Sequence, residues 1–231
     1  GGPEAATLLI QGTIPANRSS FAVKGAIHHP DACFRAELEK RLKGKGITLD
    51  KQKIEDGERH ALLTTVSPFL KDIVYYTNKN SINLFAEALG ELISPTDYAR
   101  TVKAELSGMG IDSCGITLKD ASGLSPANAV PAEVFTDLLI WAKGHLSDAF
   151  VASLPQGNED WGLRIYSDHP VLRENVIAKT GSMSGVRALA GYLKTQRGET
   201  LAFTILVNNY VGDPVKVQEI IRDLLKEFAD K

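Results

Sequence analysis

The stretch NVIAKTGSMSGVRALAGYL, residues 175–193, decides the fold. It begins with Val176–Ala178, a short apolar run of the kind that forms a strand, and this run stops at Lys-Thr-Gly, residues 179–181. A second strand-like run, Ala188–Leu193, follows a few small residues later. A third, Leu201–Asn208, comes after the turn sequence Gln-Arg-Gly-Glu. These runs predict three antiparallel strands, with a cation, a hydroxyl and a glycine at the edge of the sheet.

Helical patterns surround these strands on both sides in the sequence. Serine or aspartate followed by proline is a common helix start, because the side chain caps the helix and proline fits its first turn. Helices are predicted to start near Asp31, Ser67-Pro68, Phe85, Ser94-Pro95, Pro131 and Asp213-Pro214. Helices that flank a hairpin-connected antiparallel sheet predict an α/β (α+β) layered fold.

Composition excludes several function classes. The 231 residues are 43% hydrophobic, which is enough for a substantial core, and their formal net charge is −2. Lysine and arginine are scattered, so the sequence predicts no nucleic-acid or membrane-surface partner. The two cysteines, Cys33 and Cys114, do not form a disulfide framework. No residue pattern indicates a metal site or an organic cofactor.

Three polar stretches carry the candidate chemistry. They are Ser81-x-Asn83, the loop of Asp120 to Ser125 with the sequence DASGLS, and the KTGS sequence at 179–182. Each stretch alone is common, as a helix cap, a turn or a solvated strand end. Their order, their spacing and their longer sequence context together indicate one composite active site.

With these residues the chain resembles the low-molecular-mass penicillin-binding proteins, which are serine D-alanyl-D-alanine carboxypeptidases and endopeptidases with inserted domains. The signature of the family is Ser-x-x-Lys, then Ser-x-Asn, then Lys-Thr-Gly. The resemblance runs from about Gly12 onward and is strongest at 76–93, 116–128 and 176–193. It implies a β-lactamase/transpeptidase-like fold and a peptidoglycan stem peptide ending in D-Ala-D-Ala as substrate. It also implies β-lactams as ligands and a periplasmic or other extracytoplasmic location.

The residues at 179–182 suit recognition of a peptide carboxylate. The ammonium group of Lys179 is a compact positive charge, and the hydroxyls of Thr180 and Ser182 can donate to the same carboxylate. Gly181 leaves room for an extended peptide along the strand edge. By resemblance, the backbone N–H of Ser182 is one of two oxyanion donors, and a donor of this kind contributes about 3 kcal/mol to transition-state stabilisation.

The other two stretches receive their roles from the resemblance. Ser81 would relay a proton to the leaving amine, close to Lys179. The carboxamide of Asn83 can both donate to and accept from the peptide bond of the substrate. Ser122, Gly123 and Leu124 would line the substrate side of the cleft. The loop departs from the family at two positions: Ala121 stands where glycine is more usual, and Pro126 stands where arginine is more usual.

The first motif of the family is missing. No serine in the chain has a lysine three residues later. Ser20 and Ser67 have one four residues later, but Ser20 lies in a strand-like stretch and Ser67 is interpreted as a helix cap. The chain is therefore interpreted as a C-terminal part, incomplete at the N-terminus of the fold, without a signal peptide. Residues 1–24 would be strands from the end of an inserted domain, at Leu8–Ile10 and Phe21–Val23, and residues 25–231 the C-terminal part of the catalytic domain.

Two further interpretations stay open at this point. The chain could belong to a non-catalytic relative that binds peptidoglycan or a protein, although such a binder has no use for the proton relay of Ser81. It could also belong to a β-lactamase or esterase of the same fold, which the SGLS loop disfavours. In every case a part without its nucleophile helix is expected to expose apolar surface. It would then self-associate or depend on the N-terminal segment of the same protein.

Overall fold

The structure is a computed structural model, and it describes residues 12–14, 16–17, 19–22, 29–48, 61, 63–157, 161–166 and 168–230. The chain divides into two units, Gly1–Thr64 and Thr65–Lys231. All three strands and every residue of the candidate site lie in the second unit.

The first unit contains one described helix, α1, at Pro30–Gly44. The helix predicted near Asp31 is thus present, but its N-cap is His29, and Asp31 lies in its first turn. None of its residues is buried, and Phe34 is 68% exposed, so the apolar stripe of α1 has no described core to pack against.

The strands predicted in the first 24 residues are not supported where the structure describes them. Phe21 and Ala22 lie outside any strand, and Phe21 is 46% exposed without a paired neighbour strand to shelter it. Leu8–Ile10 and Val23 lie outside the described residues. The expected domain boundary between residues 24 and 25 also falls outside them and stays a prediction.

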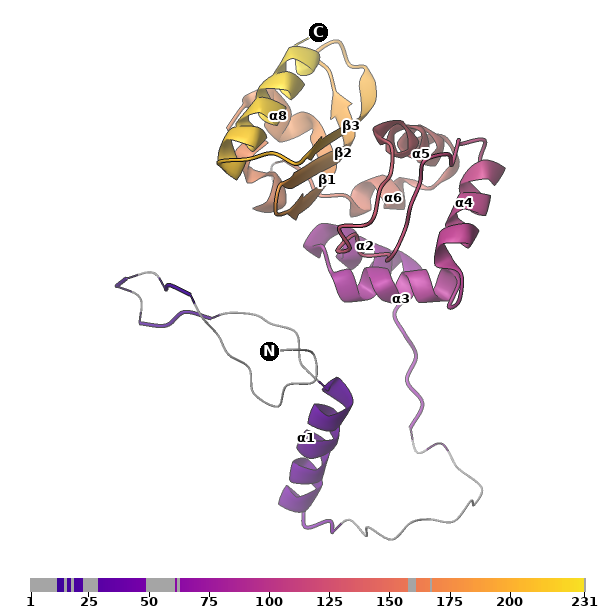
Figure 1. Ribbon diagram of the computed structural model, residues 1–231, viewed down its shortest axis with the longest axis vertical. Coiled ribbons are helices and arrows are strands. Elements are labelled where there is room, and N and C mark those ends of the chain that lie inside the picture. The colour runs from indigo at the N-terminus through magenta and orange to yellow at the C-terminus, as the bar shows by residue number, and fades with distance from the viewer. Residues whose placement is uncertain are drawn as a thin grey trace. The chain divides into compact units, whose positions relative to one another are not determined.

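The second unit is a layered arrangement of helices and strands (Figure 1). Its elements in chain order are α2 Leu70–Asn80, α3 Asn83–Ile93, α4 Tyr98–Gly108, α5 Ala132–His145, α6 Asp148–Ser153, the 3₁₀-helix η1 Trp161–Tyr166, α7 Pro170–Asn175, β1 Val176–Met183, β2 Val186–Lys194, β3 Thr200–Asn208 and α8 Pro214–Ala229.

The three strands form one antiparallel sheet in the order β1-β2-β3, as the sequence predicts. The register pairs Thr180 with Leu189 and Leu189 with Ile205. In the turn between β2 and β3 the N–H of Thr195 donates to the carbonyl of Glu199, and Gly198 has a φ of +84° that favours glycine. The first strand is longer than its apolar run, so Lys-Thr-Gly lies inside β1 rather than beyond its end.

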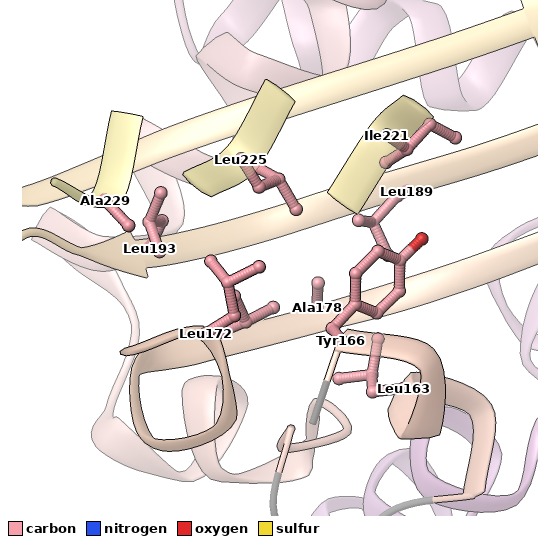
Figure 2. Close-up of a cluster of buried hydrophobic side chains, with 10 residues drawn as sticks. Leu163, Tyr166, Leu172, Ala178, Leu189, Leu193, Ile221, Leu225 and Ala229 are labelled. Atoms are coloured by element: carbon pink, nitrogen blue, oxygen red, sulfur yellow. The ribbon is translucent and has the colours of Figure 1, made fainter. Parts of the chain in front are cut away.

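Helices cover both faces of this sheet, which confirms the predicted α/β layered class. On one face α7, α8 and η1 close the largest core cluster (Figure 2). Leu172, Leu189, Leu193 and Leu225 meet there, each no more than 2% exposed. On the other face α5 and α6 pack against Tyr192, whose buried hydroxyl donates to the carbonyl of Leu139 over 2.7 Å.

The helices themselves were predicted correctly more often than the residues at which they begin. Helix α8 begins as expected, with Asp213 accepting from the N–H of Val215. Helix α2 begins only at Leu70 with Phe69 as N-cap, so the interpretation of Ser67 as a helix cap is wrong. Helix α4 begins after Asp97, whose carboxylate accepts from the N–H of Arg100. Its N-cap is therefore this aspartate and not the predicted Ser94-Pro95 pair.

Close approach of β1 and β2 generates a stability prediction. A Cβ added at Gly191 would lie 2.1 Å from the carbonyl oxygen of Ile177, a backbone atom that cannot move aside. We expect Gly191→Ala to lower the free energy of unfolding by about 2–3 kcal/mol through overpacking. Urea denaturation measures this loss. Gly108→Ala is the matched control, because nothing lies within 4 Å of an added Cβ there. Equal midpoints for both variants would contradict the prediction.

Candidate active site

Two residues 98 positions apart meet at the centre of the site. The Nζ atom of Lys179 donates to the Oγ atom of Ser81 over 2.8 Å and to the carbonyl oxygen of Thr180 over 2.8 Å. Successive strand residues point to opposite faces, so Lys179 shares the face of Ile177, which packs with the core under α5 and α6. The convergence expected from the sequence is therefore present. The chemical roles of the two residues stay predictions.

The backbone around Ser81 is bent so that its hydroxyl reaches the sheet. Ser81 is the C-cap of α2 and lies in the left-handed region, with φ 53° and ψ 51°. This conformation costs a serine about 1 kcal/mol, and a glycine would avoid the cost but would lack the hydroxyl. One turn earlier, the side-chain amide of Asn78 donates to Oγ of Ser153 over 2.8 Å, which ties α2 to the buried end of α6.

Burial lowers the pKa of Lys179 from its ordinary value of 10.5. Loss of water around the amine disfavours the charged form, and among the described residues Lys179 has no carboxylate partner to offset this effect. The amine is therefore closer to proton transfer at moderate pH than an ordinary lysine. This property suits a group that shares a proton with a neighbouring hydroxyl.

The outer edge of β1 becomes free where the Lys-Thr-Gly sequence starts. The N–H of Ala178 donates to the carbonyl of Pro155, and the carbonyl of Val176 accepts from the N–H of Gly157. In an antiparallel strand every second residue directs its N–H to the same edge. The N–H groups of Thr180 and Ser182 therefore face this outer edge, and no backbone acceptor for them lies in the part of the chain that the structure describes.

Strand alternation divides the polar side chains of β1 between two faces. Thr180 and Ser182 share the face of Ala178, toward α8, whereas Lys179 lies on the other face. The amine and the two hydroxyls can reach one ligand only around the strand edge. A Cβ added at Gly181 would lie 3.3 Å from Cβ of Ala188, so glycine relieves crowding against β2 here. Room for a ligand along the strand stays a prediction.

Arg187 is a charged neighbour that sequence analysis did not single out. It is paired with Ser182 across the sheet, so the two side chains share a face. Its Nη1 atom donates to the carbonyls of Met183 and Val186, and its guanidinium lies over the ring of Tyr210 at 5.6 Å. Both residues line a hollow of about 580 Å³ beyond the end of β1. Only the strand register reveals this neighbour.

The predicted substrate loop is built around Asp120. Its carboxylate accepts from the N–H of Gly123 over 2.8 Å, from the N–H of Ser125 over 2.6 Å and from the side-chain amide of Asn128 over 2.8 Å. Desolvation acts to raise the pKa of Asp120. The hydrogen bonds from Asn128 and from the backbone of Ser125, Gly123 and Leu124 outweigh it and hold the pKa below 3.8.

The remaining predicted site residues, apart from Ser122, lie at exposed positions. Asn83 is the first residue of α3, and it is exposed just after the turn at Ser81. Leu124 is 58% exposed at the tip of its loop, Gly123 is exposed, and Ser122 is partly buried. Just before and after this loop, an isolated antiparallel bridge pairs Thr117 with Ala129.

Within the described ranges, no three His, Cys, Asp or Glu residues gather closely enough to hold a metal ion.

The chain is similar to known cell-wall enzymes. A family model described as the D-Ala-D-Ala carboxypeptidase 3 (S13) family matches residues 3–231. The chain is 30% identical over 251 residues to a D-alanyl-D-alanine carboxypeptidase of Actinomadura sp. strain R39, covering 96% of this chain and 45% of that protein. It is also 30% identical over 224 residues to the D-alanyl-D-alanine carboxypeptidase DacB of Haemophilus influenzae, covering 88% of this chain and 46% of that protein.

A solved structure supports the same relationship. The crystal structure of penicillin binding protein 4 (DacB) from Haemophilus influenzae, in complex with a β-lactam, matches with a TM-score of 0.78 at 28% identity. The match covers 91% of this chain and 54% of that one. The chain thus spans about half the length of the relatives that it matches.

The buried amine generates a pH prediction. We expect the side chain of Lys179 to titrate with a midpoint below 10.5. An unfolded chain binds this proton up to its ordinary pKa, so folding stability should rise with pH between the lowered midpoint and 10.5. ¹³C NMR titration measures the midpoint, and Lys179→Met assigns the resonance and removes that rise in stability. A midpoint at or above 10.5 would disprove the effect of burial.

Proposed function

Because the chain belongs to the D-Ala-D-Ala carboxypeptidase 3 (S13) family, we propose that it is the carboxylate-binding and proton-relay part of a serine D-Ala-D-Ala carboxypeptidase/endopeptidase. The substrates would be peptidoglycan stem peptides that end in D-Ala-D-Ala. β-Lactams, which imitate that end, would acylate the same site in the parent protein. No cofactor is required by this chemistry.

The observation that carries the proposal is the contact of 2.8 Å between Lys179 Nζ and Ser81 Oγ at the start of a free strand edge. In this geometry the lysine donates to Ser81, so the serine hydroxyl keeps its own proton to give away. The hydroxyl can rotate to direct this proton at the leaving nitrogen of a peptide paired along β1. A protein that only bound peptides would gain nothing from this relay.

The proposed reaction uses this geometry as follows. A substrate pairs as an extended strand with the outer edge of β1, and its terminal carboxylate binds at Lys179, Thr180 and Ser182. A serine nucleophile of the parent protein attacks the carbonyl carbon of the penultimate residue, its hydroxyl proton passes to the lysine of the same Ser-x-x-Lys motif, and the N–H of Ser182 donates to the oxyanion that forms. The C–N bond breaks as Ser81 passes a proton to the leaving amine. Water, or another acceptor, later releases the acyl group.

The nucleophile is assigned to a segment of the parent protein outside these residues. The chain contains no Ser-x-x-Lys, and its relatives are about twice as long as the matched part. Two surfaces support a partner segment: β3 ends the described sheet, and α8 exposes an apolar ridge. The ridge consists of Ile220 and Leu224, which are 68% and 40% exposed. Without such a segment the same ridge would promote self-association.

With a peptidoglycan substrate, the parent protein would act outside the cytoplasm, in the periplasm or another extracytoplasmic compartment. In the described parts of the chain, no helix combines the length and the apolar character that crossing a membrane requires.

Labelling with a fluorescent penicillin tests the assignment of the nucleophile. We expect the full-length protein to become covalently labelled and the 231-residue chain to remain unlabelled, because the chain lacks Ser-x-x-Lys. Gel fluorescence after denaturation measures the covalent adduct. Labelling of the chain alone would show that its nucleophile was misplaced. An unlabelled but folded full-length protein would favour the non-catalytic relative.

Substitution of the lysine tests the relay. In the full-length protein, Lys179→Ala should slow penicillin acylation by about 100-fold or more, because the charge beside the carboxylate and the partner of Ser81 are both lost. Lys194→Ala is the control, since Lys194 is exposed at the far end of β2. Stopped-flow acylation measures both rates. If Lys179→Ala reacts as fast as the control, the lysine does not hold the carboxylate.

A further inference from the structure

A single carboxylate joins the helix of the Ser-x-Asn motif to the predicted substrate loop. Glu87 lies in α3 four residues after Asn83, so both side chains are on one face of the helix. Its Oε1 atom accepts from the N–H of Ser122 over 3.0 Å, and its Oε2 atom accepts from the N–H of Ala121 over 3.4 Å. We infer that Glu87 is a positioning residue that sets the distance between Asn83 and the loop at 122–124.

A second contact on α3 makes this attachment rigid. Gly90 is buried one turn beyond Glu87, and a Cβ added there would lie 2.6 Å from Cβ of Ala121. The loop therefore rests directly on the backbone of the helix. Figure 1 shows the segment between α4 and α5 running back toward α2 and α3 before it returns. The alanine at 121, where glycine is more usual in the family, packs over the glycine of the helix.

The loop is also held together internally. Asp120 holds the N–H groups of Gly123 and Ser125, and Gly123 has a φ of +79° that closes the turn. The tip at Leu124, 58% exposed, lies between these two anchored N–H groups. Fixing Ala121 and Ser122 on Glu87 therefore fixes where Leu124 stands relative to Asn83, the first residue of α3.

The consequence for the reaction rests on the proposed function. Ser81 and Lys179 act at the scissile bond, whereas the loop would contact the stem residues that precede it. Removing the carboxylate of Glu87 should therefore weaken binding of a long stem peptide and leave the chemistry at the bond almost unchanged. An ordinary structural role would instead affect long and short substrates alike.

The test uses the full-length protein and two substrates. A stem pentapeptide ending in D-Ala-D-Ala reaches the loop, whereas N-acetyl-D-Ala-D-Ala carries the scissile bond alone. With Glu87→Ala we expect KM for the pentapeptide to rise about tenfold, with kcat and the kcat/KM of the short substrate within about twofold. Glu87→Gln keeps one acceptor oxygen and should fall between Glu87→Ala and the wild type.

Glu91→Ala is the matched control, an exposed glutamate one turn further along α3. Hydrogen exchange adds a readout that does not need activity: Glu87→Ala should speed exchange at Ala121 and Ser122 and leave Ala178 unchanged. Exchange identical to that of Glu91→Ala, or equal losses for both substrates, would overturn the inference. If the wild type cleaves neither substrate while exchange changes as expected, the positioning by Glu87 stands and the proposed function fails.

Discussion

A half-buried lysine amine, held against a serine hydroxyl from a distant helix end, is the contact on which the rest of the candidate site depends. Its burial without a carboxylate partner disfavours the charged form, so the surrounding packing has to hold it in place. That packing is continuous. Ser81 caps α2, Asn78 of α2 binds Ser153 of α6, and α6 packs through Phe150 and Val151 against the core under the sheet. A shift in any of these layers would separate the amine from the hydroxyl.

The outer edge of β1 is the second part of the candidate site. The segment at 155–157 pairs with the first residues of the strand and then leaves it. From Lys179 onward the edge is open, and the N–H groups of Thr180 and Ser182 are directed toward it. The strand thus belongs to the core at Val176 and Ala178, which are almost fully buried, and a few residues later it has the free edge that the proposed function uses for peptide recognition.

The turn between α2 and α3 connects the Ser81–Lys179 contact with the loop of Ser122 to Leu124. Sequence analysis had grouped these regions without showing how they are joined. Helix α2 delivers Ser81 to the sheet, and α3 carries both Asn83 and the carboxylate that holds the loop of Ser122 to Leu124. Both attachments start from backbone that is fixed locally, by the left-handed turn at Ser81 and by the buried Gly90. The proton relay and the substrate loop therefore share one rigid support.

Local signals in the sequence were enough to predict the three antiparallel strands and the aspartate cap at Asp213. Its three motifs also predicted that Ser81 and Lys179 would meet. Three features could not be predicted and depend on the packing of distant segments. They are the outward-facing N–H groups of β1, the position of Arg187 opposite Ser182, and the hydrogen bond from the Ser122 N–H to Glu87. The starts of α2 and α4 were misjudged, because competing caps lie within a few residues of one another. Helix and strand propensity, periodicity and capping act over a few neighbouring residues, so they can be recognised in a sequence. Strand register and hydrogen bonds between distant segments depend on how the packed layers bring those segments together, so they cannot.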